Sequence, residues 1–129
     1  MSEREFIVLP NMEQRPYSSA VRAGDFIFFS GTVGVVDPQG EPVEGIEAQT
    51  RRCLQNLKRT LEAAGASFPD VVKVQVFLSR AEDWDKMNEV YKEYFPKDRP
   101  ARTTLIHQPV KPKTLIEMEC IAYKPGPKP

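Results

Sequence analysis

The sequence has no excess of one charge and no long apolar run. Its 129 residues include eighteen Lys and Arg against eighteen Asp and Glu, so no net field draws the chain to nucleic acid or to an acidic membrane. No stretch approaches the roughly 18 consecutive apolar residues that span a bilayer, and the segment after Met1 lacks the pattern of a signal peptide. We therefore expect a cytoplasmic protein with no membrane anchor and no nucleic-acid partner.

Histidine, cysteine and glycine are scarce, and their scarcity excludes several kinds of site. One histidine and two cysteines cannot supply a metal-ligand set, and the seven glycines include no GxxxxGK phosphate loop. His107 is the only histidine, which we interpret as a satisfied packing residue rather than the base of a catalytic triad. Cys53 and Cys120 are expected to be reduced thiols in the core. We therefore predict neither a metal nor a redox role.

The length of the sequence predicts a single domain over residues 1–129. Its last residues, KPGPKP, predict a frayed tail at 124–129. Apolar residues at spacings of three and four predict helices over 46–64 and 81–95. Alternating or β-rich stretches predict strands at 6–9, 19–31 (a hairpin around Gly24 and Asp25), 71–78, 102–108 and 114–123. This order predicts an α+β fold in which two helices cover one face of a mixed six-stranded sheet.

The patterns also predict which side chains are buried. Within 71–78, one face should be formed by Val72, Val74, Val76 and Leu78. The second helix should bury a stripe formed by Trp84, Met87, Tyr91 and Tyr94.

The last strand predicts what the uncovered face of the sheet carries. One parity of that strand is apolar, whereas the other places Glu117 and Glu119 among Leu115, Ile121 and Tyr123. The two glutamates either lie in solvent at the centre of that face or belong to a polar site with a nearby arginine. An uncovered apolar face usually marks an interface, so we expect a homo-oligomer.

Five blocks of sequence resemble one known family in order and spacing. They are RPYSSAVRAGDFIFFSG, EAQTRRCLQNLKRTLEAAGAS, DVVKVQVFLSRAEDWDKMNEVYKEYF, RPARTT and LIEMECIA. Together they cover residues 15 to 123 and are similar to the RidA (YjgF/YER057c/UK114) family of reactive-intermediate deaminases. The resemblance implies a chorismate-mutase-like fold and a homotrimer with clefts between subunits. It also implies cofactor-free hydrolysis of enamines and imines such as 2-aminoacrylate to 2-keto acids and ammonia.

The resemblance assigns roles to four residues. Arg102 would hold the substrate carboxylate, and Glu117 would position the attacking water. Tyr17 would line the pocket, and Gly31 would bring backbone close to the ligand. The chain also departs from the commoner family pattern at Thr32, which leaves the substrate range open.

The chemistry of the same residues can be argued without the family. A guanidinium grips a carboxylate with two parallel charge-assisted hydrogen bonds, although Arg102 alone could equally be a solvated cation at the start of a strand. Thr104, which also departs from the family pattern, lies one strand period from Arg102, so its hydroxyl can face the same cleft and hold the water or the amino group. Glu117 can take the proton of the attacking water. Asn88 and Arg99 are interpreted as structural.

Two other functions stay open at this point. One is a non-catalytic trimer that binds a 2-keto or imino acid, as a sensor or chaperone. The other is an endoribonuclease or translation inhibitor, for which the cluster Arg51, Arg52, Lys58 and Arg59 would have to form a basic patch.

Overall fold

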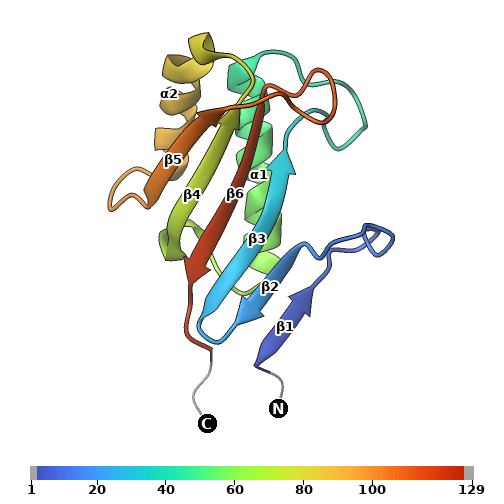
Figure 1. Cartoon of the computed structure of the whole chain (residues 1–129), viewed down its shortest axis with the longest axis vertical. Helices are drawn as coiled ribbons and strands as arrows, with labels where there is room; N and C mark the ends of the chain where they lie inside the picture. Colours follow the sequence, from blue (N-terminus) through green and yellow to red (C-terminus); the bar gives the residue numbers. More distant parts are fainter. Residues whose placement is uncertain (1–2, 127–129) are drawn as a thin grey trace.

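Both helices lie on the same face of a six-stranded sheet in the computed structural model of the protein, which describes residues 3–126 (Figure 1). The strands are β1 (Arg4–Ile7), β2 (Ala20–Ala23), β3 (Phe26–Val33), β4 (Val71–Leu78), β5 (Ala101–Ile106) and β6 (Ile116–Tyr123). The helices are α1 (Ile46–Ala63) and α2 (Trp84–Tyr94), with short 3-10 turns at Phe68–Asp70 and Ala81–Asp83. The expected tail at 124–129 lies partly outside the described residues.

The sheet is mixed, as the sequence predicted. Its order is β1-β2-β3-β6-β4-β5, in which β4 and β5 are parallel and the other neighbours are antiparallel. The β2–β3 hairpin turns at Gly24, whose φ of 61° is left-handed and suits glycine. β5 is an edge strand, so the polar groups on its outer side are not paired within this sheet.

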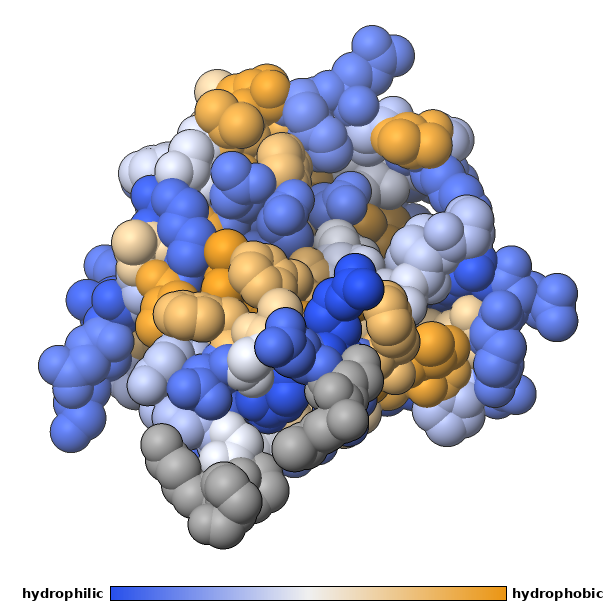
Figure 2. Space-filling model, turned by 60° about the horizontal axis from the view of Figure 1, so that its bottom comes forward, coloured by the Kyte–Doolittle hydropathy of each residue, from blue (hydrophilic) through white to orange (hydrophobic). Residues whose placement is uncertain are grey.

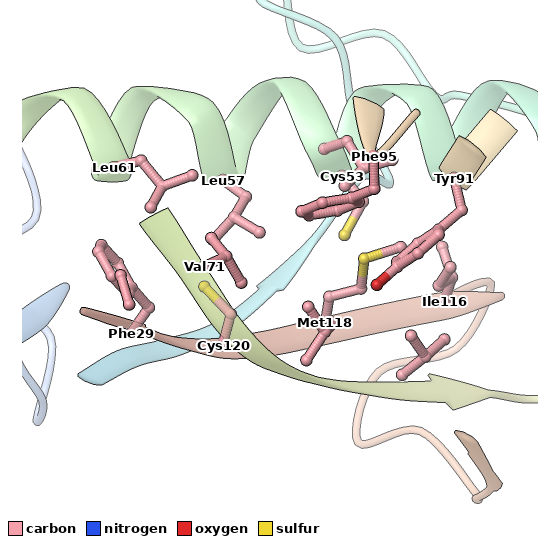
Figure 3. Packing of buried hydrophobic residues seen from close by; sticks show 14 of the residues in the cluster. Phe29, Cys53, Leu57, Leu61, Val71, Tyr91, Phe95, Ile116, Met118 and Cys120 are labelled. Carbon is pink, nitrogen blue, oxygen red and sulfur yellow. The ribbon is translucent and has the colours of Figure 1, made fainter. Parts of the chain in front are cut away.

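The core lies between α1 and the helix-covered face of the sheet (Figure 3). The predicted stripe of α1 is buried, with Cys53, Leu57 and Leu61 inaccessible to solvent. These side chains meet the apolar parity of β6, including Met118. Gly34 lets the end of β3 approach α1 closely, because a Cβ there would collide with the helix backbone at Gln49 and Cys53. Cys53 and Cys120 are free and buried, as predicted.

Two predictions of burial are wrong, for different reasons. Val72 was expected on the buried face but is 43 % exposed, because a β-bulge between Val71 and Lys73 puts Val71 in the core instead. Trp84 was expected in the core stripe of α2 but is 48 % exposed, whereas Met87 and Tyr91 are buried. Trp84 begins α2, where the stripe reaches the edge of the sheet.

The other face of the sheet is bare of helices and carries exposed aromatic side chains. Phe26, Phe28 and Tyr123 are each about half exposed, and the rings of Phe26 and Tyr123 lie 5.2 Å apart. From the end of the molecule that carries both termini, apolar patches are visible among hydrophilic side chains (Figure 2). No helix within residues 3–126 has the length and apolar character that crossing a membrane requires.

Candidate active site

Arg102 lies on the edge strand β5, on the helix-covered face. Its register partner on β4 is the buried Val74, so its side chain is directed toward α2. The guanidinium carbon lies 5.2 Å from the centroid of the Trp84 ring and 4.7 Å from that of Tyr91. Within the described part of the chain, no carboxylate forms an ion pair with Arg102. Because an aromatic ring attracts a cation through its face, the N–H edge of the guanidinium stays available to a ligand.

Two other arginines, Arg51 and Arg80, have structural roles because each binds a carboxylate of the same chain. Arg51 makes two hydrogen bonds to the Glu93 carboxylate, at 2.7 and 3.1 Å. Arg80 donates two hydrogen bonds to the buried Asp83 carboxylate, at 2.9 and 2.8 Å. Asp83 occupies the N-cap position of α2, although its side chain makes no capping hydrogen bond. The second pair lies directly before Trp84, the first residue of α2. Arg102 therefore differs from both in having its charge uncompensated.

Tyr91 places a phenol beneath the Arg102 guanidinium. Burial raises the pKa of Tyr91 to about 12, and the positive charge of Arg102 opposes that shift. The Tyr91 hydroxyl is buried and has no hydrogen bond of good geometry to any residue that the structure describes. Figure 3 shows it directed toward Met118. Tyr91 thus supports Arg102 mainly through its ring.

A pocket of about 270 Å³ opens beside Arg102. Its lining is formed by Asn88, Tyr91, Lys92, Arg99, Pro100 and Arg102. Asn88 was interpreted as structural, but it lines this pocket. Its spacing of three and four residues from Tyr91 and Lys92 indicates that they share one side of the helix, but not that this side borders a pocket.

Arg99 makes local hydrogen bonds, which fits its interpretation as structural, and also lines the pocket. Its Nε donates to the Phe95 carbonyl at 2.7 Å, and its Nη2 donates to the Pro96 carbonyl at 3.1 Å. These carbonyls follow α2, so Arg99 closes the helix end. Thr104 pairs with Val76 on the same face as Arg102 and is half-buried, but it is not among the residues that line the pocket.

Glu117 lies on the opposite, bare face of the sheet. It pairs with Val33 and Phe77, and its neighbours Ile116 and Met118 point into the core. Its carboxylate lies directly against Gly31, where any Cβ would collide with it. This close approach occurs at a β-bulge between Phe29 and Thr32.

Tyr17 belongs to the same region as Gly31. Its neighbour Ser18 accepts a 2.7 Å hydrogen bond from the Ser30 hydroxyl, which ties the Tyr17 segment to the residue before Gly31. Tyr17 is 51 % exposed, and the guanidinium of Arg15 lies 5.9 Å from its ring. Tyr17, Gly31 and Glu117 thus form one group, and Arg102 belongs to another. Within one chain, the structure does not bring Arg102 and Glu117 together.

His107 fits only part of its predicted role. Its ring packs against Phe77 at 5.4 Å, but its Nε2 atom is buried and has no hydrogen-bond partner among residues 3–126. His107 is therefore a packing residue, but the expectation that its polar atoms are hydrogen-bonded is wrong for Nε2. The described residues contain no group of three acidic, histidine or cysteine side chains that could hold a metal ion.

Known proteins resemble this chain over most of its length. The sequence model of the family described as Endoribonuclease L-PSP matches residues 11–124. A RutC family protein of Pyrococcus abyssi is 49 % identical over 110 residues, which cover 84 % of this chain and 87 % of that protein. A 2-iminobutanoate/2-iminopropanoate deaminase of Dermatophagoides farinae is 35 % identical and covers 94 % of this chain, which in turn covers 97 % of that protein. Further relatives are named as chloroplastic or mitochondrial proteins.

The fold is similar as well. A solved structure of a Mycobacterium tuberculosis member of the YjgF/YER057c/UK114 family superposes with a TM-score of 0.81 at 30 % identity, over 93 % of this chain and 98 % of that one. The match in sequence covers the segments that carry both groups of candidate residues. The chain therefore belongs to the Endoribonuclease L-PSP family, which is the YjgF/RidA family that the five sequence blocks indicated.

Proposed function

We propose that this protein hydrolyses small 2-imino acids and their enamine tautomers, such as 2-aminoacrylate, to 2-keto acids and ammonia. The observation that carries the proposal is Arg102, whose guanidinium contacts two rings, lacks a carboxylate partner and borders a small pocket. Such a group suits one carboxylate of a very small ligand. The family includes proteins named for this reaction.

The site requires two copies of the chain. Arg102 and Glu117 lie on opposite faces of one sheet, so a cleft that contains both needs Arg102 from one subunit and Glu117 from its neighbour. The half-exposed aromatic residues of the bare face and the unpaired side of β5 give each copy a surface to bury. We propose a cyclic homotrimer, which repeats this contact three times and leaves none open.

The substrate would bind through its carboxylate. Arg102 donates two parallel hydrogen bonds to that group, and the Asn88 amide at the same pocket can donate a third. Tyr17 and the backbone at Gly31 close the other side, contributed by the neighbouring subunit. Holding so small a molecule at one end fixes where its reacting carbon lies.

Hydrolysis then needs one water and one base. The enamine takes a proton on its terminal carbon and becomes the imine. Water attacks C2, the electron pair of the C=N bond moves to nitrogen, and Glu117 takes a proton from the water. Glu117 passes this proton to nitrogen, which gives the carbinolamine. The hydroxyl proton then moves to the amino nitrogen through the Glu117 carboxylate, the C–N bond breaks as the C=O bond forms, and ammonia leaves. Glu117 ends as the carboxylate it began as, so the sum is imine plus water to keto acid plus ammonia.

Thr104 has a supporting role in this scheme. It lies on the Arg102 face, one strand period along β5. Its hydroxyl can hold the attacking water or the amino group once the partner closes the cleft. No step requires a cofactor. We place the reaction in the cytoplasm, although relatives named for chloroplast and mitochondrion indicate that the family works in several compartments.

The test generates 2-aminoacrylate with a serine or threonine dehydratase and traps the remaining imine with semicarbazide. The protein should lower the trapped fraction and speed keto-acid release, and light scattering should give the mass of a trimer. An unchanged trapped fraction would contradict the deaminase. A stable monomer at micromolar concentration would contradict the shared cleft.

A further inference from the structure

The pocket beside Arg102 carries more positive charge than one carboxylate needs. Three of its six lining residues are cationic, Lys92, Arg99 and Arg102, and no Asp or Glu lines it. The whole chain has equal numbers of basic and acidic residues, so this excess is local. The nearby Glu93 does not offset it, because its carboxylate is bound to Arg51 on α1.

The positions of the cations relative to the helix suggest two binding points. Lys92 lies one turn beyond Asn88 on α2, and both line the pocket. Arg99 is fixed by the Phe95 and Pro96 carbonyls, which are neutral, so its charge remains. Arg102 lies on β5 against the α2 rings. Lys92 and Arg99 thus provide positive charge in addition to the guanidinium assigned to the substrate carboxylate.

The size of the pocket allows a longer ligand. Its volume of about 270 Å³ is on the order of nine times the share of liquid volume that one water takes. On a single subunit the pocket is open to one side, so this is the room available before the neighbouring subunit closes the cleft. A five-carbon acid with a carboxylate at each end would place one group on Arg102 and the other near Lys92 and Arg99.

We propose that this site prefers 2-imino acids, and the corresponding 2-keto acids, that carry a second carboxylate, and that Lys92 and Arg99 recognise that group. The inference rests on the proposed function, because it uses Arg102 as the first anchor. It adds the substrate class: dicarboxylic imino acids, such as those formed when an oxidant takes a hydride from the α-carbon of an acidic amino acid and its nitrogen loses a proton.

The test measures binding by calorimetry with two stable keto acids of equal chain length. 2-Oxoglutarate and 2-oxopentanoate differ in the terminal group, which is a carboxylate in one and a methyl in the other. Lys92 and Arg99 are exposed, so each should contribute only about threefold. The wild-type protein should therefore bind 2-oxoglutarate about tenfold more tightly at low ionic strength, and added salt should reduce the difference.

Variants assign the effect to a residue. Lys92→Gln should lower the preference about threefold, and Lys92→Arg should keep it. Lys86→Gln removes the same charge from the same helix outside the pocket, so it should leave the preference unchanged. Equal affinity of the wild type for both acids, no binding of either, or a preference that Lys92→Gln does not lower would each overturn the inference. Hydrolysis of the imine derived from 2-aminoacrylate, measured separately, would still decide the proposed deaminase.

Discussion

Replacing Arg102 with alanine should remove nearly all deaminase activity without unfolding the protein. Its guanidinium has no carboxylate partner among the described residues, and its N–H edge is not used by an ion pair. Losing a two-pronged charge-assisted contact should cost about 2 to 4 kcal/mol of transition-state binding, roughly 30-fold to 1000-fold in kcat/KM. Arg102→Lys should lose a similar share of activity, because an ammonium keeps the electrostatic attraction but cannot donate two parallel hydrogen bonds to the carboxylate.

The same contacts set the cost in stability. Arg102 contacts the half-exposed ring of Trp84 and the buried ring of Tyr91. Such a contact is worth about 0.5 to 1 kcal/mol at an exposed site and about 2 kcal/mol when desolvated, so the free energy of unfolding should fall by about 2 to 3 kcal/mol. The assay is the semicarbazide trap with in situ 2-aminoacrylate, together with urea denaturation. Arg59→Ala on the exposed side of α1 is the control and should change neither.

Two results would refute this reasoning. If Arg102→Ala unfolds or dissociates the protein, the arginine is structural. If the variant is folded and keeps near wild-type activity, the substrate carboxylate is held elsewhere.

Three further changes test other parts of the account. Gly31→Ala should fold, because the added methyl displaces only the end of the Glu117 side chain, but its turnover should fall sharply. Unchanged turnover would show that the contact between Gly31 and Glu117 has no part in the mechanism. Trp84→Leu should lower kcat/KM about two- to fivefold through a higher KM as Arg102 loses one ring, and Trp84→Phe should restore it; no difference between the two variants would show that the ring is irrelevant. Burial raises the pKa of each of the two thiols to about 12, so the unfolded chain ionises first as pH rises above the ordinary thiol value of about 9. Unfolding free energy should then fall by about 1.4 kcal/mol per thiol by pH 10. Cys53→Ala should remove about half of that dependence, because Cys120 keeps its share; urea midpoints that do not change between pH 8 and 10 would contradict it.

Local patterns predicted much of the fold. The stripe of apolar residues in α1 and the alternation in β6 are both found in the structure, since each is fixed by the period of its own element. The strand at 71–78 has the predicted bounds. The position of Val72 could not be predicted, because a bulge depends on how β4 pairs with β6, which alternation within one strand does not reveal.

The candidate site was predictable only in part. The sequence indicated Arg102 and Glu117 but not that they lie on opposite faces, because that relation depends on strand order and register across the sheet. Trp84 fits the helical period of α2 and was therefore assigned to the core, whereas its place at the helix start leaves it half exposed beside Arg102. The position of Asn88 in the pocket became clear only once α2 was placed against β5.

We propose that one active site combines Arg102 of one subunit with Glu117 of another. Mixing two inactive proteins tests it most directly. Arg102→Ala and Glu117→Gln variants would be denatured together in equal amounts, refolded, and compared with each variant refolded alone. Random assembly of a cyclic trimer leaves about a quarter of the sites with both residues intact, so the mixture should regain about a quarter of wild-type deaminase activity. A mixed trimer that stays as inactive as its parents would contradict the shared site.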